Sequence, residues 1–233
     1  MRKKIRSDLA WSTADKIVVR GKDLPNEILG HLNLGDMAFL VILGRVPDKN
    51  ESRLFNAMAV TLVEHGMTPS AIAARMTYVG APESPQAAVA AGLLGLGSVF
   101  VGSMEGVAKM LSENANIDGM KRVPGLGHPI HKPVDPRTVR LFEIARETGF
   151  YGKYCQRMEE IGRLRNLVVN ATGAIGALAC ELGIDWRAVR GIGVMARAIG
   201  LVGHILEEAK LPMALELWER TEEEASAHLK PKK

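Results

Sequence analysis

Cysteine and aromatic residues are scarce in this chain of 233 residues. The two cysteines, Cys155 and Cys180, do not have the spacing of a metal site, and we expect two reduced structural thiols in a cytosolic protein. Aromatic residues make up 5% of the chain, and no basic stripe alternates with them. This composition argues against the stacking surfaces of nucleic-acid-binding proteins, and we expect no nucleic-acid partner.

Charge of either sign is not in large excess. The formal net charge is +4, and part of it comes from lysines and arginines within residues 2–6 and 230–233, which we expect to be solvated tails. A mild positive balance suits an anionic substrate. No apolar signal core follows the basic N-terminal residues, so we expect a cytoplasmic protein.

One long stretch lacks charge. Ala87–Met104 is 18 residues without a charged side chain, which is near the lower limit for a membrane span. It is rich in alanine and glycine, and no aromatic belt flanks it. We therefore predict a closely packed helix over Ala87–Val101, suited to a subunit interface, and no membrane partner.

Helical periodicity dominates the rest of the chain. Apolar residues recur at i, i+3 and i+4 spacing, whereas Ile17–Arg20 is the one clear extended stretch. Asp135 followed by Pro136 is a typical helix start, and Gly149 is a typical stop. The pattern predicts an all-α fold, with longer helices beginning at 52 and spanning 136–148, 164–182 and 186–210.

The glycine- and proline-rich segment 119–136 concentrates groups that can bind a ligand. Glycines at 125 and 127 let the backbone approach a ligand closely, and His128 is presented on a loop. Lys132 can meet a phosphate, and Arg137 lies in the first turn of a helix, where the free N–H groups favour anions. A plain linker is the alternative, but the density of such groups favours function.

Three further sets of polar residues are ambiguous. His65, within Glu64-His65-Gly66, reads from local sequence as a capping histidine. Arg197 and His204 share a helical face, where a buried arginine needs a carboxylate from either a substrate or a structural glutamate. A satisfied core histidine is the simpler reading of His204. Asn170 and Thr172 interrupt an apolar run and can back-bond within a helix.

These segments together resemble the citrate synthase superfamily, and most of all its citryl-CoA lyases and the C-terminal lyase module of ATP-citrate lyase. The likeness runs from about Ile5 to Lys210. It is carried by Ser7–Ser12 with Asp15–Gly21, His65–Ser70 with Ala73–Arg75, Gly125–His128 with Asp135–Arg137, and Arg197–Gly200 with Gly203–His204.

The resemblance implies a large helical domain with a smaller helical lobe. Residues 1–233 would form one citrate synthase-like unit, with about 1–120 and 163–233 in the large part and about 121–162 in the small lobe. It also implies a homodimer or higher homo-oligomer.

The resemblance further implies a role for each candidate residue. His65 and His128 would hold the oxygen on the carbon that is attacked or cleaved, and all the anion-binding groups would converge on one pocket. Coenzyme A, as acyl-CoA substrate or product, would be the cofactor, and no metal is implied. The acid would be bound by Arg137, Arg197 and Asn170, and CoA by Val123, Pro124, Gly125, Leu126, Gly127 and Lys132.

Two positions depart from the synthase pattern. Glu105 stands where citrate synthases carry a histidine that stabilises the acetyl-CoA enolate, a histidine that citryl-CoA lyases also lack. Thr172 stands where the family has an aspartate that acts as base or acid, and a threonine cannot act as a carboxylate base. Both positions are catalytic in the family pattern.

The resemblance therefore implies a carbon–carbon lyase that cleaves citryl-CoA, or a related 3-hydroxy-3-carboxyacyl-CoA, to acetyl-CoA and oxaloacetate. Two alternatives stay open. One is a citrate synthase-type acyltransferase that uses a different oxoacid. The other, suggested by Thr172, is a non-catalytic relative that binds CoA or an oxoacid.

Overall fold

The computed structural model describes residues 5–230, and it is predominantly helical. The basic residues Arg2, Lys3, Lys4, Lys232 and Lys233, which we expect in solvated tails, lie outside this range. The small amount of strand near the N-terminus forms an antiparallel sheet in the order β1-β2-β3. The all-α fold class is confirmed. The strands are β1 (Ala10–Ser12), β2 (Ile17–Val19) and β3 (Lys22–Asp23).

The described chain separates into two compact units. The first extends to Thr61 and resumes over Ser103–Arg190, and the second comprises Leu62–Gly102 and the residues from Gly191 onward. The predicted lobe at 121–162 stays a prediction. The helices that lie wholly or mostly in the first unit are a π-helix (Leu24–Ile28), α1 (Leu34–Leu43), α2 (Lys49–Val63), α5 (Gly102–Ser112), α6 (Pro136–Thr148), α7 (Lys153–Leu164) and α8 (Ala171–Glu181).

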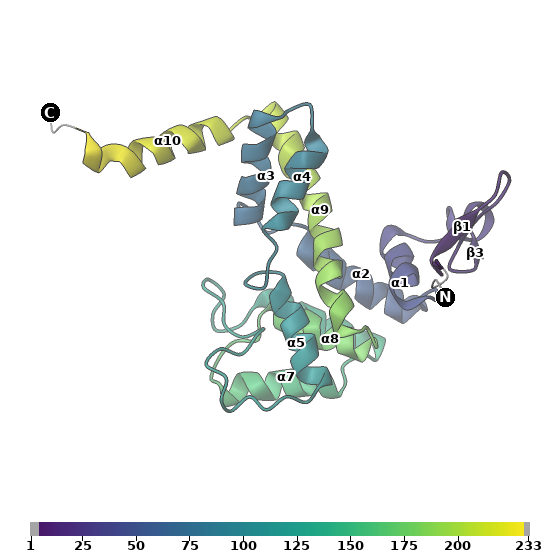
Figure 1. Ribbon diagram of the computed structural model, residues 1–233. Coiled ribbons are helices and arrows are strands. Elements are labelled where there is room, and N and C mark those ends of the chain that lie inside the picture. The colour runs from purple at the N-terminus through teal and green to yellow at the C-terminus, as the bar shows by residue number, and fades with distance from the viewer. Residues whose placement is uncertain (1–4, 231–233) are drawn as a thin grey trace. The chain divides into compact units, whose positions relative to one another are not determined.

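The second unit is built from helices of both halves of the chain. α3 and α4 lie side by side, with most of α9 along them (Figure 1). Gly92 permits this close packing, because a Cβ there would lie 2.8 Å from the Ser70 carbonyl oxygen and 2.7 Å from Leu201. The helices are α3 (Pro69–Gly80), α4 (Pro85–Leu94), α9 (Trp186–Lys210) and α10 (Ala214–Ser226), followed by a 3-10 turn (Ala227–Leu229).

Local signals place the ends of α6. The Asp135 carboxylate accepts a hydrogen bond from the Arg137 N–H at the start, and Gly149 ends the helix in the left-handed conformation at φ 82°. The predicted start and stop of this helix are confirmed, as are the bounds predicted for α9.

Two predicted helices are interrupted. The helix expected over 164–182 is wrong, because α7 ends at Leu164 and the chain turns through Asn166 at φ 49° before Asn170 caps α8. The helix expected over Ala87–Val101 is also wrong, since α4 ends at Leu94. In both cases the chain turns inside a mainly apolar segment, and the residues at the turn do not mark it clearly in the sequence.

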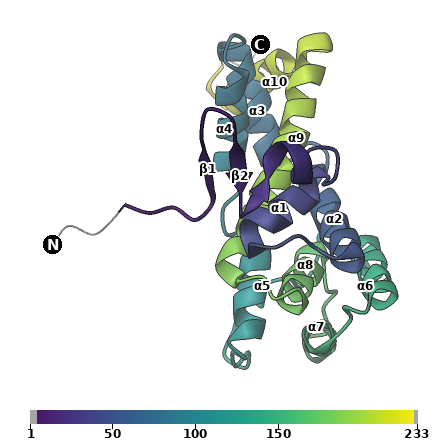
Figure 2. The same cartoon turned by 90° about the vertical axis from the view of Figure 1, so that its right-hand side faces the viewer.

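The core of the first unit lies around α8. Its side chains from Ala171 through Ala179 are buried except for Thr172, and α6 and α7 pack against it (Figure 2). A Cβ on Gly176 would lie 2.7 Å from the Met104 carbonyl oxygen and 2.6 Å from Val107. The small residues of α8 therefore let α5 approach closely.

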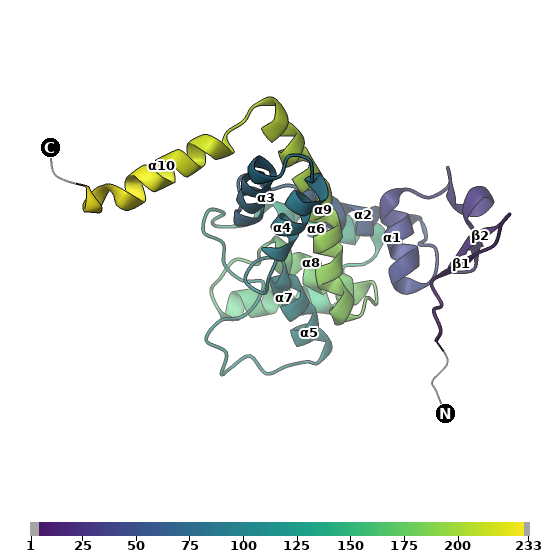
Figure 3. The same ribbon diagram turned by 45° about the horizontal axis from the view of Figure 1, so that its top comes forward.

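The last helix is amphipathic and has few contacts. α10 contacts α3 and buries Ala214 in its first turn, and its remainder points away from the other helices of its unit (Figure 3). No helix was predicted after residue 210, so this helix is a finding of the structure. Leu215 and Trp218 are exposed on it.

One helix in the described range, α9, is long and apolar enough to cross a membrane by length and composition. Of its most apolar stretch, 44% is buried within the structure. The core helix of a soluble protein passes the same test, so this property carries no assignment.

Candidate functional site

The glycine-rich loop is fixed against the start of α8. Its backbone pairs with the segment before α8, through the Gly127 N–H on the Val168 oxygen at 2.7 Å and the Asn170 N–H on the Gly125 oxygen at 3.0 Å. Gly125 has φ +77°, and a Cβ there would lie 2.6 Å from the Gly173 Cα. Only glycine allows this approach, so the loop has a defined backbone. Its ligand-binding role stays a prediction.

Asn170 connects this loop to the helix. Its Oδ1 accepts hydrogen bonds from the Gly173 N–H at 3.1 Å and the Thr172 hydroxyl at 2.7 Å, while its Nδ2 donates to the Gly127 oxygen at 2.7 Å. Asn170 is thus a helix cap, and the helix-interior reading of this residue is wrong. Its amide has one donor N–H without a described acceptor, which a ligand can use.

Ser103 belongs to the same cluster and was missed by the sequence reasoning. Its Oγ accepts a hydrogen bond from the Gly125 N–H and lies 3.1 Å from the Thr172 Oγ1. Because the Thr172 proton is directed to Asn170, the Ser103 hydroxyl is left to donate to Thr172. No local motif marks Ser103, since both of its partners are distant in sequence.

Asp135 does more than cap α6. Its carboxylate binds the Arg137 guanidinium through Nε at 3.0 Å and Nη2 at 2.8 Å, and it also accepts the Ala171 N–H at 3.0 Å. Burial raises the pKa of Asp135, but the hydrogen bonds and charge of Arg137 and the Ala171 N–H outweigh it and hold that pKa below its usual value. Asp135 is therefore a fixed anion that orients Arg137.

His128 and Arg137 present two donors side by side. The His128 Nδ1 accepts the N–H groups of Ile130 at 3.2 Å and His131 at 3.0 Å, and the two imidazoles stack with centroids 4.3 Å apart. The proton of the neutral imidazole is thereby assigned to Nε2, which lies 3.2 Å from the Arg137 Nη2. Two adjacent N–H donors suit one oxygen acceptor of an anionic ligand.

The other predicted residues of the first unit lie apart from this cluster or at its edge. The Glu105 carboxylate pairs with the Arg190 guanidinium at 3.0 Å through each oxygen. Val123 is buried, Pro124 faces Gly106, and Lys132 is exposed. The structure thus gives Glu105 an ion-pair partner, and its catalytic role stays a prediction.

In the second unit, the Arg197 guanidinium is buried, and few hydrogen bonds or opposite charges offset the cost of burying its positive charge. Its side chain is 9% exposed, its Nε and Nη1 have no hydrogen-bond partner among the described residues, and Nη1 lies 4.0 Å from the Glu64 carboxylate. Burial lowers the pKa of Arg197, and Glu64 opposes that shift. A buried guanidinium without hydrogen bonds is costly, so this site favours an incoming carboxylate.

His65 lies on the turn after α2 and is exposed. The neighbouring Glu64 carboxylate accepts the backbone N–H groups of His65 at 2.7 Å and Gly66 at 2.6 Å. Burial raises the pKa of Glu64, but these two hydrogen bonds and His204 outweigh it and lower that pKa. The reading of His65 as a simple cap is incomplete, because the turn is held by Glu64.

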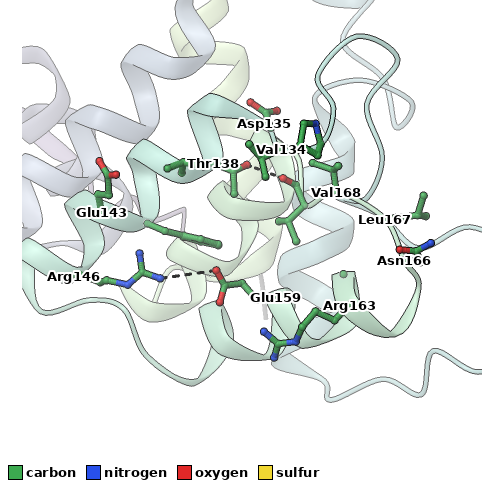
Figure 4. A pocket seen from close by; sticks show the side chains of 15 residues that line it. Val134, Asp135, Thr138, Glu143, Arg146, Glu159, Arg163, Asn166, Leu167 and Val168 are labelled. Carbon is green, nitrogen blue, oxygen red and sulfur yellow. Dashed lines mark hydrogen bonds and ion pairs between the residues drawn. The ribbon is translucent and has the colours of Figure 1, made fainter.

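An open pocket of about 540 Å³ lies in the first unit between α6, α7 and residues 166–169 (Figure 4). Val139 and Phe142 are among its apolar lining, and Arg146 and Glu159 pair across it with 3.9 Å between them. The predicted catalytic residues do not line it. Asp135 is among its lining, so the pocket touches the cluster around Asn170 on the side of this residue.

Within residues 5–230, no group of three or more histidine, cysteine, aspartate or glutamate side chains could hold a metal ion. That no metal takes part stays a prediction. Burial raises the pKa of Cys155, and that of Cys180 to about 12, so both thiols stay protonated at neutral pH.

The structure brings together His128, Arg137, Asn170 and Thr172 in the first unit, and His65 with Arg197 in the second. The expectation that all of them converge on one pocket stays a prediction. The sequence did signal the glycines, the histidines and the arginines.

The chain matches the family described as "Citrate synthase, C-terminal domain" over residues 31–216. Among solved structures, citryl-CoA lyase from Hydrogenobacter thermophilus is 35% identical, with a TM-score of 0.82 over 88% of this chain and 87% of that chain. ATP citrate lyase from Methanothrix soehngenii, solved in complex with citrate and coenzyme A, has a TM-score of 0.72 at 22% identity, over 91% of this chain and 40% of that chain. The second likeness shows the fold alone.

One relative in sequence is a probable ATP-citrate synthase from Dictyostelium discoideum. It is 24% identical over 241 residues, which cover 88% of this chain and 38% of that protein. The chain thus spans about two-fifths of the length of this relative. The predicted family resemblance and the helical fold are confirmed by these findings.

Proposed function

This chain belongs to the citrate synthase C-terminal domain family, and from that premise we propose that it is a carbon–carbon lyase that cleaves citryl-CoA to acetyl-CoA and oxaloacetate. The observation that carries the proposal is the pair of donors on His128 Nε2 and Arg137 Nη2, 3.2 Å apart beside the glycine-rich loop. The likeness to a citryl-CoA lyase over almost the full length of both chains supports the lyase direction.

The proposed reaction is a retro-Claisen cleavage. The tertiary hydroxyl loses its proton, its oxygen becomes the carbonyl of oxaloacetate, and the electron pair of the broken C–C bond passes to the acetyl-CoA enolate. The enolate is then protonated on carbon to give acetyl-CoA. Fixed hydrogen-bond donors lower the barrier most where negative charge develops on oxygen.

A role in this chemistry is proposed for each candidate residue. In the first unit, His128 donates to the substrate oxygen that becomes the carbonyl, and Arg137, held by Asp135, binds a carboxylate. The backbone of residues 123–127, with Lys132, binds CoA. In the second unit, the proposed roles are carboxylate binding for Arg197 and a hydrogen bond to substrate for His65.

Proton transfer is the weakest part of the site, because no carboxylate stands at Thr172. The Thr172 hydroxyl is held between Asn170 and Ser103. The buried Asp135 cannot serve as the acid–base group that is missing at position 172, because its carboxylate already accepts hydrogen bonds from Arg137 and from the Ala171 N–H. General acid–base help contributes about 10²–10⁴-fold, so we expect turnover slower by a factor of that order than in relatives with an aspartate here.

Purified protein incubated with citryl-CoA tests the proposal, with acetyl-CoA as the measured product. Formation of acetyl-CoA and oxaloacetate in equal amounts supports the proposal. If no acetyl-CoA forms above background, cleavage of citryl-CoA is rejected. A panel of acyl-CoAs and oxoacids, followed by free-thiol release, tests the synthase alternative.

The second candidate is a non-catalytic protein that binds CoA and an oxoacid, and Thr172 favours it. Calorimetric titration with CoA and with oxaloacetate beside the turnover assay separates the two candidates. Binding without turnover supports this second candidate, whereas turnover excludes it.

A Thr172→Asp variant tests the role of this position. If the chain is a lyase slowed by loss of the aspartate, activity on citryl-CoA rises. If Thr172 is instead adapted to another substrate, activity on that substrate falls. If the rates on citryl-CoA and on the other substrate are both unchanged, position 172 is not the position of the family aspartate.

A further inference from the structure

Glu64 fixes the backbone that carries His65. One carboxylate oxygen, Oε1, accepts the N–H groups of both His65 and Gly66 at 2.7 and 2.6 Å. Gly66 has φ +75°, a conformation that glycine adopts without strain. The turn after α2 therefore has its two N–H groups tied to one charged acceptor.

The other carboxylate oxygen of Glu64 faces α9. Its Oε2 lies 3.0 Å from the His204 Nε2 and 4.0 Å from the Arg197 Nη1. A Cβ on Gly200 would lie 2.9 Å from this oxygen and would overlap the Val63 carbonyl oxygen. Gly200 is thus the residue that lets the end of α2 come close enough for Glu64 to reach α9.

His204 is held in one tautomer by a buried arginine. Its Nδ1 accepts from the Arg75 Nε at 3.1 Å, with Nη2 at 2.9 Å, so the proton of the neutral ring is on Nε2 and faces Glu64. This Nε2 is close to Glu64 without the alignment of a full hydrogen bond. Proximity and charge, more than directed hydrogen bonding, link the two residues.

Arg75 is itself held on its other side. Its guanidinium is 1% exposed and donates to the Glu208 Oε2 at 2.8 Å, and it also pairs with Glu207. Glu208 Oε1 accepts the N–H groups of Met213 and Ala214 at the start of α10. Side-chain contacts therefore connect Glu208, Arg75, His204 and Glu64 in that order within the second unit.

We propose that Glu64 is a positioning residue that holds His65 in its working orientation and restrains the affinity of Arg197 for the substrate carboxylate. The inference rests on the proposed function and adds a residue to which no role has been given. Glu64 and an incoming carboxylate compete for the same guanidinium. Removing the Glu64 charge should therefore tighten anion binding while it slows turnover.

A merely structural ion pair would behave differently. It would lower stability and the amount of folded enzyme, and it would leave kcat per folded molecule and KM unchanged. Glu51 offers the matched control, since it lies in the first turn of α2, pairs with Arg45 and accepts the Asp48 N–H, and it takes no part in the site.

The experiment compares Glu64→Gln, Glu64→Ala and Glu51→Gln with the wild type. For Glu64→Ala, which removes the acceptor of the His65 and Gly66 N–H groups, we expect kcat on citryl-CoA to fall about 10- to 100-fold, as for a displaced catalytic group. For Glu64→Gln, which keeps an acceptor oxygen and removes only the competing negative charge, we expect KM to fall about fivefold. Glu51→Gln should change neither constant. Unchanged kcat in Glu64→Ala, or a raised KM in Glu64→Gln, overturns the inference.

Two readouts do not need turnover. Amide hydrogen exchange of the peptide that contains residues 64–68 should quicken in Glu64→Ala and not in Glu51→Gln. Oxaloacetate should bind Glu64→Gln more tightly than wild type. If the wild type cleaves no citryl-CoA, the proposed function fails while these measurements still decide the role of Glu64, and unchanged exchange together with unchanged binding refutes it.

Discussion

Replacing Asp135 by asparagine should destabilise the protein at neutral pH by about 3 kcal/mol, in the range measured when one partner of a buried ion pair is removed. The Asp135 side chain is fully buried, and its carboxylate accepts hydrogen bonds from Arg137 and Ala171. An asparagine keeps one acceptor oxygen for the Arg137 backbone. Its NH₂ group would face the Ala171 N–H and the Arg137 Nη2, so donors would oppose donors in a buried place.

The same change should have a defined dependence on pH. The pKa of Asp135 is lower in the folded protein than in the unfolded chain, because Arg137 and two backbone N–H groups outweigh the effect of burial. Its contribution to stability is therefore complete above the unfolded pKa of about 3.9 and is lost as pH falls through the folded value. The stability difference between Asp135→Asn and wild type should shrink below about pH 4.

Urea unfolding followed by circular dichroism, at pH 7 and at several lower values, measures this difference. Asp185 provides a matched control, because its carboxylate binds the Arg187 N–H, Nε and Nη2 in the same arrangement while both side chains are exposed. Asp185→Asn should cost far less, although Arg187 lowers the pKa of Asp185 to about 2. Equal losses in the two variants, or an Asp135→Asn loss that does not vary with pH, would refute the reasoning.

Three further outcomes are expected. Gly200→Ala should lower stability by about 2 kcal/mol in thermal unfolding, because the added methyl overlaps the Val63 carbonyl oxygen; an unchanged Tm would contradict the close approach. Gly125→Ala should weaken CoA binding in calorimetry, since φ +77° is strained for alanine and its Cβ would lie 2.5 Å from Val107; unchanged affinity would remove this loop from the CoA site. Arg197→Met should keep or raise the Tm, because a poorly compensated buried charge is removed, while oxaloacetate binding measured by calorimetry is lost; a lower Tm with binding intact would make Arg197 structural.

Much of the helical fold follows from local chemistry in the sequence. Asp135-Pro136 and Gly149 specify the two ends of α6 by capping and by a left-handed residue, and such signals act within a few residues. The break between α7 and α8 was missed because Asn170 lies in an apolar run. An asparagine there reads equally well as a cap or as an exposed helix residue until its partners are known.

The site residues could be predicted only where a local sequence pattern marks them. Glycines beside His128 and an arginine after Asp135-Pro136 are local patterns. Ser103 gave no signal, because its hydroxyl gains meaning only when α8 brings Thr172 to 3.1 Å from it. Glu64 is likewise an ordinary surface residue in sequence, and its role depends on α9 packing against the end of α2.

The two arginines predicted to bind carboxylates are in unequal electrostatic states, and this difference bears on what each can contribute. Arg137 has a built-in counter-ion, since Asp135 holds it through two nitrogens, so its charge is largely balanced before any ligand arrives. Arg197 is buried, has two nitrogens without hydrogen bonds among the described residues and has Glu64 no nearer than 4.0 Å. A ligand carboxylate at Arg197 therefore relieves an existing desolvation cost, whereas at Arg137 it adds a second anion beside the first. Anion affinity should thus come mainly from Arg197, and Arg137 should contribute direction, because its Nη2 lies beside the His128 Nε2 and places the carboxylate that it binds next to the oxygen that His128 contacts.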